Sequence, residues 1–234
     1  MERQAMQYLL SWKDKRKRKP LIIKGARQVG KTWLMKEFGR RNFEQTVYIN
    51  FESSKFLKNL FEADYEIKRI ISAIQIESGL QINVENTLII FDEIQEAEGG
   101  LTVLKYFYEN APEYYILAAG SLLGITLHKE TSFPVGKVDF IDLSPMNFQE
   151  FLLAKQGQQL LDPLLKNEWP LITQFKVKYI NLLRQYYYVG GMPEAVSFFC
   201  ETEDYNEIRE IQNNILNAYE QDFSKHAPPE IVPR

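Results

Sequence analysis

Cysteine and histidine are nearly absent from this sequence, and their scarcity excludes several classes of protein. The one cysteine, Cys200, cannot form a disulfide within the chain. We therefore expect a protein of a reducing compartment rather than an extracellular protein stabilised by disulfides. Neither of the two histidines lies near Cys200 in the sequence, which favours a packing role for this residue over a nucleophilic one.

The sequence also lacks a long apolar run and a strong net charge. The longest mostly apolar stretch, residues 115–127, falls well short of the roughly 20 residues that a membrane-spanning helix needs. At the N-terminus the charges follow a short apolar patch and no small-residue cleavage site comes after them, unlike a secretory signal. A formal net charge of -3 creates no global field that attracts nucleic acid. We expect a soluble, cytoplasmic protein with no membrane partner.

Apolar side chains are abundant, and their pattern is typical of strands that alternate with helices. Hydrophobic residues make up 45% of the 234 residues, enough for a sizeable core. Apolar runs rich in β-branched residues predict strands over 20–24, 46–51, 87–91, 113–119 and 137–143. Helical spacing predicts helices over 2–17, 31–40, 64–78 and 101–109. Nearly all-apolar strands in this order predict an α/β domain over residues 1–143, with a parallel sheet covered on both faces.

After residue 143 the signals for strands stop. We expect helices over 148–156, 173–189, 193–201 and 204–223, so that residues 144–224 form a helical lid or appendage. Asn147 and Glu150 have the spacing of a capping box at the start of the first of these helices. The proline-rich segment 225–234 cannot continue a helix and is expected to be a linker or a disordered tail.

The segment KGARQVGKTW, residues 24–33, contains the phosphate-binding pattern G-x-x-x-x-G-K-[ST] from Gly25 to Thr32. Such a short pattern also arises by chance, as a strand, loop and helix with a fortuitous Lys-Thr. Here a predicted buried strand precedes it and a predicted helix follows it, so backbone N–H groups can surround a phosphate. Lys31 is expected to reach the β and γ phosphates, and the Thr32 hydroxyl to bind Mg²⁺. The residues predicted to contact the nucleotide are Gly25, Ala26, Arg27, Gln28, Val29, Gly30, Lys31, Thr32 and Trp33.

A second, independent signal is the apolar stretch LIIFDE, which ends in Asp92 and Glu93. The carboxyl end of a buried strand reaches the ligand crevice of an α/β sheet. Asp92 is predicted to hold Mg²⁺ there. Glu93 is placed to orient and deprotonate an attacking water, which favours hydrolysis over transfer to a small acceptor. The alternative is that both acids cap the following helix.

The end of the strand 113–119 carries a third signal, Gly120-Ser121. In the expected fold this strand lies between the other two, so a polar residue at its tip can contact the γ-phosphate or the water. Ser121 is the candidate for this catalytic sensor position, and a helix cap is the alternative. ATP is expected rather than GTP, because the guanine-reading patterns N-K-x-D and T-K-x-D are absent.

Five segments together resemble a known family: PLIIKGARQVGKTWLMKEF, LIIFDEIQ, AAGSLL, VDFIDLSPMNFQEFL and YYYVGGMPEAV. They are similar to the prokaryotic AAA-type P-loop ATPases that carry a C-terminal domain of unknown function, and to archaeal ATPases related to signal-transduction ATPases. The resemblance runs from about residue 10 to residue 223.

This resemblance implies a five-stranded P-loop NTPase core with an additional strand between the Walker A and Walker B strands, followed by a helical lid. It implies ATP and Mg²⁺ as cofactors. It assigns residues 25–32 to the phosphates, Asp92 and Glu93 to metal and water, and Ser121 to the sensor position. It names no substrate.

Two departures from the family pattern affect these expectations. Family members usually continue into a C-terminal domain, so we expect this chain to be a fragment whose lid acts with that missing domain or with a protein partner. The family tends to have Gly-Arg before the fifth strand, where this sequence has Gly136-Lys137. Lysine keeps the charge but loses the bidentate fork, which puts a transition-state role for that position in doubt.

Three further segments have both a structural and a functional interpretation. The basic run KDKRKRK, residues 13–19, is a solvated helix end or a nucleic-acid patch. In GGMPEAV, residues 190–196, the glycines end one helix and the proline begins the next, or the segment is a lid hinge. Residues 186–188, three consecutive tyrosines, pack between helices or stack on bases. In each case we favour the structural interpretation.

The sequence therefore predicts Mg-dependent hydrolysis of ATP, coupled to movement of the lid and of a C-terminal domain. Two alternatives remain open: a slow ATP/ADP-binding switch that relays a signal to a partner, and a DNA-associated ATPase. A small-molecule kinase is a third possibility, against which the Glu93 carboxylate argues. Arg40, Arg41 and Arg184 are candidates for an arginine finger, and nothing in the sequence selects one of them.

Overall fold

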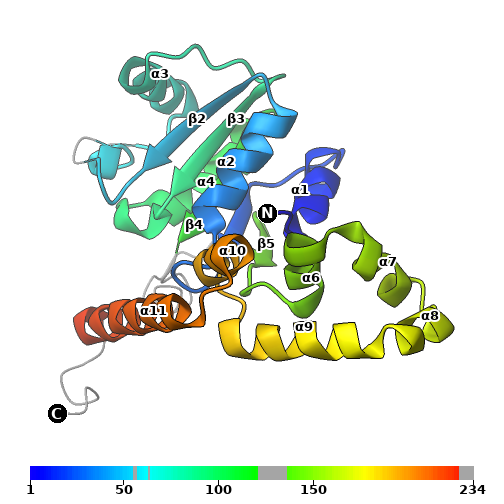
Figure 1. The fold of residues 1–234 in the computed structure, drawn as a ribbon. Coiled ribbons are helices and arrows are strands. Elements are labelled where there is room, and N and C mark those ends of the chain that lie inside the picture. The colour runs from blue at the N-terminus through cyan, green and yellow to red at the C-terminus, as the bar shows by residue number, and fades with distance from the viewer. Residues whose placement is uncertain (55–56, 63, 121–135, 227–234) are drawn as a thin grey trace. The chain divides into compact units, whose positions relative to one another are not determined.

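A computed structural model of the chain describes residues 1–54, 57–62, 64–120 and 136–226 (Figure 1). By its internal contacts the chain divides into two compact units. One comprises residues 4–26 and 30–143, and we call it the sheet unit. The other comprises residues 1–3, 27–29 and 144 onward, and we call it the helical unit.

The sheet unit is built on a parallel sheet with the strand order β2-β3-β4-β1-β5. Its strands are β1 (Leu21–Lys24), β2 (Gln45–Asn50), β3 (Thr87–Asp92), β4 (Tyr115–Gly120) and β5 (Asp139–Asp142). In register, Ala119 of β4 lies between Ile23 of β1 and Asp92 of β3. The predicted five-stranded parallel sheet is thereby confirmed, with β4 as the additional strand between β1 and β3.

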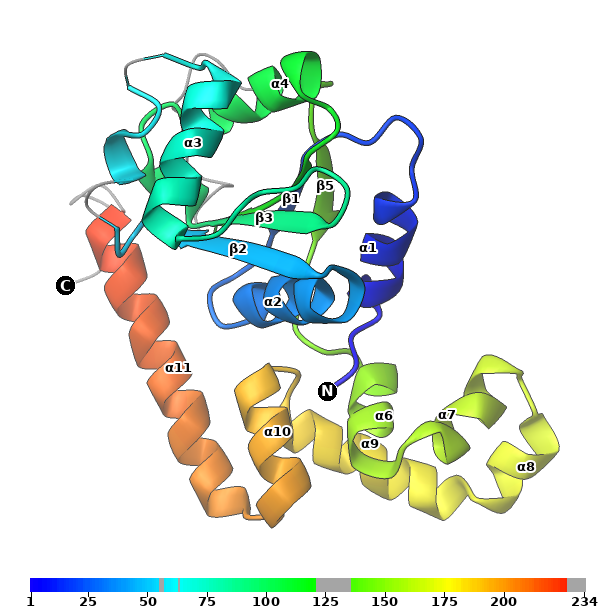
Figure 2. The same cartoon turned by 90° about the horizontal axis from the view of Figure 1, so that it is seen from above.

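Helices cover both faces of this sheet, as the two views in Figures 1 and 2 show. On one face lie α1 (Ala5–Lys13) and α2 (Lys31–Asn42), and on the other lie α3 (Ile67–Ser78) and α4 (Gly100–Asn110). Two single-turn 3₁₀ helices, η1 (Leu57–Asn59) and η2 (Ile94–Glu96), follow β2 and β3. The expected helix over 2–17 is wrong at its end, because the last buried residue is Trp12 and only charged residues follow up to 19.

Aromatic rings form the centre of the core on the side of α3 and α4. The ring of Phe91 lies with its centroid 5.6 Å from that of Phe51, 6.2 Å from Phe61 and 6.0 Å from Phe107. All four side chains are buried. Since Phe91 directly precedes Asp92, this packing gives the end of β3 a rigid support.

The helical unit consists of helices from residue 148 onward. They are α6 (Phe148–Gln156), α7 (Gln158–Leu165), α8 (Trp169–Gln174), α9 (Lys176–Val189), α10 (Pro193–Thr202) and α11 (Tyr205–His226). The capping box of α6 is confirmed, with both reciprocal hydrogen bonds between Asn147 and Glu150. No helix was expected over 158–172, where Pro163 and Pro170 disfavour one. The single helix expected over 173–189 is wrong at its start, because α8 ends at Gln174 and α9 begins at Lys176. Pro170 lies in the first turn of α8, where proline is tolerated.

The segment Gly190-Gly191 joins α9 to α10 in a close-packed turn. Gly190 ends α9 with a φ of 75°, and a Cβ on Gly191 would overlap the carbonyl oxygen of Met146. The Met146 N–H donates to the Gly191 carbonyl at 2.6 Å, and the Tyr186 hydroxyl donates to the Met146 carbonyl at 2.8 Å. These contacts supply a packing reason for Gly191 and for Tyr186, whereas the positive φ explains the glycine at position 190.

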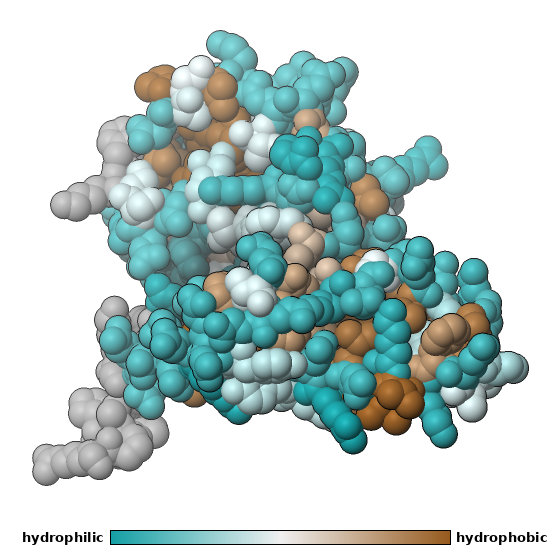
Figure 3. Space-filling view, in the orientation of Figure 1, coloured by the Kyte–Doolittle hydropathy of each residue, from teal (hydrophilic) through white to brown (hydrophobic). Residues whose placement is uncertain are grey.

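Apolar side chains also reach the surface of the helical unit. Figure 3 shows them gathered over the region of α7, α8 and α9. The exposed large apolar residues of this region, which contains the junction of α8 and α9, include Leu165, Trp169, Leu171, Phe175, Val177 and Ile180. Gathered surface groups of this kind are typical of interaction sites. None of the helices that the structure describes has both the length and the apolar character needed to cross a membrane.

Candidate active site

The loop between β1 and α2 has the backbone of a tight, glycine-dependent turn. Gly25 has a φ of 155° and Gly30 a φ of 90°, values that L side chains rarely adopt. Gln28 also has a positive φ, 63°, although it is not a glycine. Left-handed backbone at a non-glycine residue costs free energy and clusters at functional sites. The loop is therefore held in a shape that its sequence alone does not favour.

The N-terminus of α2 offers hydrogen-bond donors at the end of this loop. The cap residue is Gly30, and no side chain caps the first turn. The first N–H groups of a helix have no partner within the helix, and the helix dipole adds partial positive charge there. An anion at this position would supply the missing acceptors.

Lys31 is the first residue of α2, and its side chain is held inside the loop. The residue is only 6% exposed. Its Nζ donates to the carbonyl of Gly25 at 2.9 Å and to that of Ala26 at 2.8 Å. Burying an ammonium group is costly unless it is hydrogen-bonded. The arrangement keeps a positive charge against the first residues of the loop.

Asp92 connects three elements of the sheet unit through one carboxylate oxygen. The residue is 2% exposed, and its Oδ2 accepts from Thr32 Oγ1 of α2 at 2.6 Å. The same oxygen accepts from the hydroxyl of Tyr48 in β2 at 2.8 Å. The two motifs that the sequence singles out, residues 25–32 and LIIFDE, thus meet at one point.

The donors at Asp92 have the chemistry that suits Mg²⁺. A carboxylate and a hydroxyl are hard oxygen ligands, and Mg²⁺ usually keeps only one or two protein ligands beside water and phosphate oxygens. Among the described residues there is no group of three or more His, Cys, Asp and Glu side chains that could hold a metal ion. Thr32 and Asp92 could hold a magnesium ion whose other ligands are water and phosphate oxygens.

Tyr48 is a site residue that sequence reasoning missed. Burial is the main cause that raises the pKa of its phenol, to about 12, so the hydroxyl is protonated at neutral pH and donates to Asp92. The ammonium of Lys36 lies 3.6 Å from the centroid of the Tyr48 ring. In the sequence, nothing distinguishes Tyr48 from any other aromatic residue of a strand. Only the pairing of β2 with β3, which sets Asn50 opposite Asp92, places it at the site.

Glu93 follows Asp92 in a strained conformation. Its φ is 50°, and its side chain makes no capping hydrogen bond to η2. The Glu93 Oε2 accepts instead from Nε2 of Gln95 at 2.6 Å. The geometry therefore gives no support to the alternative that Glu93 caps the following helix. A non-glycine residue with a left-handed backbone is expected where a side chain must be aimed.

Gln95 is the second residue that sequence reasoning missed. Its amide nitrogen holds Glu93, while its Oε1 is buried and has no hydrogen-bond partner among the described residues. A buried acceptor without a donor is uncommon and calls for a water or a ligand. The stretch FDEIQ places Gln95 two residues after Glu93, and that spacing is the only signal that the sequence offers.

The remaining predicted residues lie as follows. Ser121 lies outside the described residues. Trp33 is exposed on α2. Arg40 and Arg41 both bind Glu37 of the same helix, at 2.7 Å and 2.6 Å, and Lys137 pairs with Glu109 at 3.0 Å. The loop residues 27–29 belong by their contacts to the helical unit.

Two sequence families match the chain. A family described as an AAA domain matches residues 17–152, which is more than half of the chain. A family described as a domain of unknown function matches residues 180–234. Comparison with curated proteins gives no match.

Among solved structures, a Walker-type ATPase of Pyrococcus abyssi matches 96% of this chain and 75% of its own length, at 15% identity and a TM-score of 0.56. The ORC2 protein of Aeropyrum pernix matches 67% of this chain and 48% of its own, at 20% identity and a TM-score of 0.40. PCH-2 of C. elegans matches 65% and 44%, at 15% identity and a TM-score of 0.38. At these identities, the likeness to the Pyrococcus abyssi ATPase shows a shared fold.

Proposed function

Because this chain belongs to the AAA-domain family of P-loop ATPases, we propose that it binds ATP with Mg²⁺ and hydrolyses the γ-phosphate. The observation that carries the proposal is the 2.6 Å hydrogen bond between Thr32 and Asp92. It joins the phosphate-loop motif and the acidic strand end into one site, as Mg-ATP hydrolysis requires.

Each residue of the site then has a role that its surroundings support. Residues 25–32 bind the phosphates through backbone N–H groups, and the Lys31 ammonium leaves its two loop carbonyls to bind the β and γ phosphates. Thr32 and Asp92 would hold Mg²⁺, whose chemistry when bound is to neutralise charge on the phosphate oxygens. The hydrogen bond from Thr32 to the buried Asp92 and the buried ammonium of the neighbouring Lys31 favour this assignment.

Glu93 is the general base in this proposal, and Gln95 is its positioning residue. The water oxygen forms a bond to the γ-phosphorus, the bond from the γ-phosphorus to the bridging oxygen breaks, and the water proton passes to the Glu93 carboxylate. Gln95 Nε2 fixes one carboxylate oxygen of Glu93. The buried Oε1 of Gln95, which has no partner among the described residues, would accept a hydrogen bond from that water. ADP and inorganic phosphate are the products.

Single-turnover hydrolysis by the purified chain tests the proposal. We expect Mg²⁺-dependent release of inorganic phosphate well above the rate of free ATP, with no acceptor other than water. Binding without such a rate would favour the alternative, a nucleotide-dependent switch that relays its state to a partner. Measuring with and without DNA separates a DNA-stimulated ATPase from both. Absence of any ATP binding would contradict the proposal outright.

Replacing Tyr48 with phenylalanine should weaken the use of Mg²⁺ while leaving the fold intact. The change removes one of the two donors to Asp92 Oδ2. Loss of such an outer-shell partner typically costs about 10-fold to 100-fold in metal affinity or activity. A titration of ATP hydrolysis with Mg²⁺ measures the shift. Tyr114→Phe, a half-buried tyrosine just before β4, is the matched control.

The pH dependence of the Mg²⁺ requirement independently tests the role of the Tyr48 hydroxyl. The Tyr48 pKa is raised to about 12, so its contribution is fully present below the ordinary tyrosine pKa of about 10. That contribution is lost only as the pH rises through about 12. The wild-type Mg²⁺ requirement should therefore stay constant between pH 7 and about 10. A tyrosine-dependent loss that begins near pH 9 would contradict the assignment.

A further inference from the structure

The middle of the phosphate loop is bound by side chains of the helical unit. Arg3 Nη1 donates to the Val29 carbonyl at 2.8 Å, and the Tyr219 hydroxyl of α11 donates to the Arg27 carbonyl at 2.6 Å. Residues 27–29 are themselves part of the helical unit. Two carbonyls of one short loop are thus held by residues that are distant from it in the sequence.

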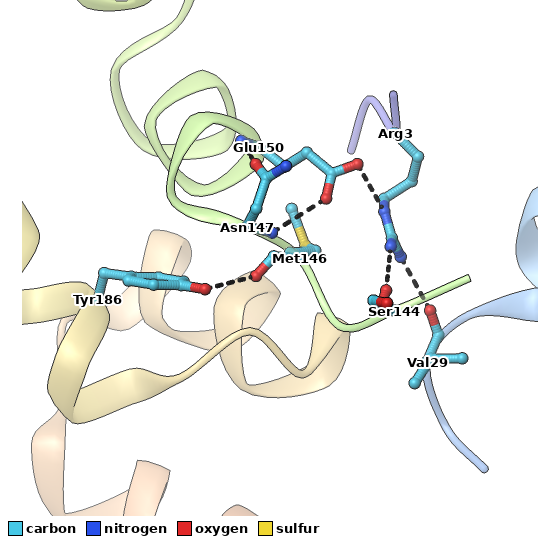
Figure 4. A network of polar contacts seen from close by, with 7 residues as sticks. All are labelled: Arg3, Val29, Ser144, Met146, Asn147, Glu150 and Tyr186. Carbon is cyan, nitrogen blue, oxygen red and sulfur yellow. Dashed lines mark hydrogen bonds and ion pairs between the residues drawn. The ribbon is translucent and has the colours of Figure 1, made fainter. Parts of the chain in front are cut away.

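Arg3 makes three hydrogen bonds with its guanidinium, as Figure 4 shows. Besides Val29, it donates through Nε to Glu150 Oε1 at 3.0 Å and through Nη2 to the Ser144 carbonyl at 2.6 Å. The side chains of Arg3 and Glu150 are only 4% and 6% exposed. Only the planar fork of arginine reaches three acceptors in fixed directions. A buried pair of this kind is weak evidence for stability, because desolvation offsets the attraction, so a positioning role has to be considered.

Glu150 is itself fixed by its surroundings. Its Oε2 accepts from the Asn147 N–H at 3.1 Å, and Asn147 Oδ1 accepts from the Glu150 N–H at 2.9 Å. Met146, which directly precedes Asn147, is hydrogen-bonded to Gly191 and to Tyr186. A series of hydrogen bonds therefore connects the loop, through Arg3 and the start of α6, to the turn between α9 and α10 (Figure 4).

The physical consequence follows from the planarity of the peptide bond. The Val29 carbonyl and the Gly30 N–H belong to one rigid, trans peptide group and point in opposite directions. Holding the carbonyl therefore sets the direction of the N–H. The same relation joins the Arg27 carbonyl to the Gln28 N–H. These two N–H groups are among the donors that a phosphate loop offers to an anion.

We propose that Arg3 and Tyr219 are positioning residues, which aim two peptide N–H groups of the phosphate loop and carry nucleotide occupancy to the helical unit. The inference rests on the proposed ATP site and goes beyond it, because it names the contacts that link that site to α6 and α11. Coupling of this kind is reciprocal. A phosphate that binds these N–H groups favours the peptide orientation in which the two carbonyl contacts form, so binding tightens those contacts and their loss weakens phosphate binding.

Tyr219→Phe is the first test, because it removes one hydroxyl and nothing else. We expect ATP binding, measured by calorimetry, to weaken by about 10-fold, the effect of losing one hydrogen bond. Tyr187→Phe is the matched control, since Tyr187 is 76% exposed on α9. It should bind ATP as the wild type does.

The double variant Arg3→Met/Glu150→Gln is the second test. It removes both buried charges together, keeps similar volume and leaves an amide oxygen to accept from the Asn147 N–H. A buried ion pair can be replaced in this way without loss of folding, whereas Arg3→Met alone would leave a buried carboxylate without its cation. The melting temperature checks the fold of the double variant.

Hydrogen exchange of the helical unit is the readout that a merely structural role would not change. In the wild type, saturating Mg-ATP should slow exchange in α6 and in residues 205–221 by about 10-fold or more, as the loop contacts tighten. In the folded double variant and in Tyr219→Phe, at ATP concentrations that saturate each, that change should fall below 2-fold.

The outcomes separate the two proposals. A wild type that does not bind ATP overturns the proposed function and this inference with it. A wild type that binds ATP without any change of exchange in α6 and α11 overturns the inference alone. So does retention of the full exchange response by the double variant and by Tyr219→Phe.

Discussion

Glu93→Gln should lower the rate of ATP hydrolysis by about 10³-fold, within the range of 10² to 10⁴ that a general base contributes. Glutamine has nearly the same shape as glutamate, so the backbone at this position and the contact with Gln95 can persist. It cannot take a proton from water. ATP binding should change by less than about 3-fold, because the substitution leaves residues 25–32 untouched.

Two measurements on each protein check this expectation: single-turnover hydrolysis for the rate and calorimetry for the affinity. Glu96→Gln is the control, since Glu96 lies in η2, which directly follows Glu93, and forms an exposed pair with Lys58 at 3.8 Å. It should hydrolyse ATP normally. A fall of less than 5-fold in Glu93→Gln would exclude Glu93 as the base. An equal loss in both variants would point to damage of η2.

Lys31→Ala should weaken ATP binding by about 10²-fold, the scale expected when one partner of a buried, hydrogen-bonded charge pair is removed. The ammonium of Lys31 already lies inside the loop on the carbonyls of Gly25 and Ala26. The substitution therefore removes a charge that is in place before the nucleotide arrives. The backbone donors of the loop remain and retain the weak residual affinity.

Calorimetric titration with Mg-ATP measures the loss, and the melting temperature shows whether the fold persists. Lys68→Ala, on the exposed surface of α3, is the control for removal of one positive charge. It should leave the affinity unchanged. If Lys31→Ala bound ATP as tightly as the wild type, the phosphate site would have to lie elsewhere, and a loss in both variants would indicate a general charge effect.

The sheet could be predicted from the sequence because its signals are local. Buried parallel strands are nearly all apolar over their whole length, as in β3, and the loop after β1 carries its own glycine pattern. The two short helices α7 and α8 escaped prediction, because proline usually ends a helix and here lies within one and near the start of the other. The basic segment after α1 is charged and has no apolar face, so the helix could not extend through it.

For the candidate site, the sequence could indicate residues inside its two motifs, but not the contacts that other segments make with them. Tyr48 reaches Asp92 because β2 pairs with β3, and strand pairing is not encoded in either strand. Arg3 reaches Glu150 across 147 residues of chain, and no spacing in the sequence suggests that contact. Gln95 follows Glu93 closely, but its importance depends on the left-handed backbone of Glu93, which a sequence does not reveal. The roles of Lys31, Glu93 and Ser121 stay predictions.

The assignment of residues 1–3 and 27–29 to the helical unit has a consequence for dividing this chain. A fragment that stopped at residue 143 would keep the whole sheet and the complete phosphate-loop motif, and by sequence it would look like a minimal ATPase. It would nevertheless lack Glu150 and Tyr219, which hold Arg3 and the Arg27 carbonyl. The shortest chain that keeps all of these contacts is therefore expected to include α11.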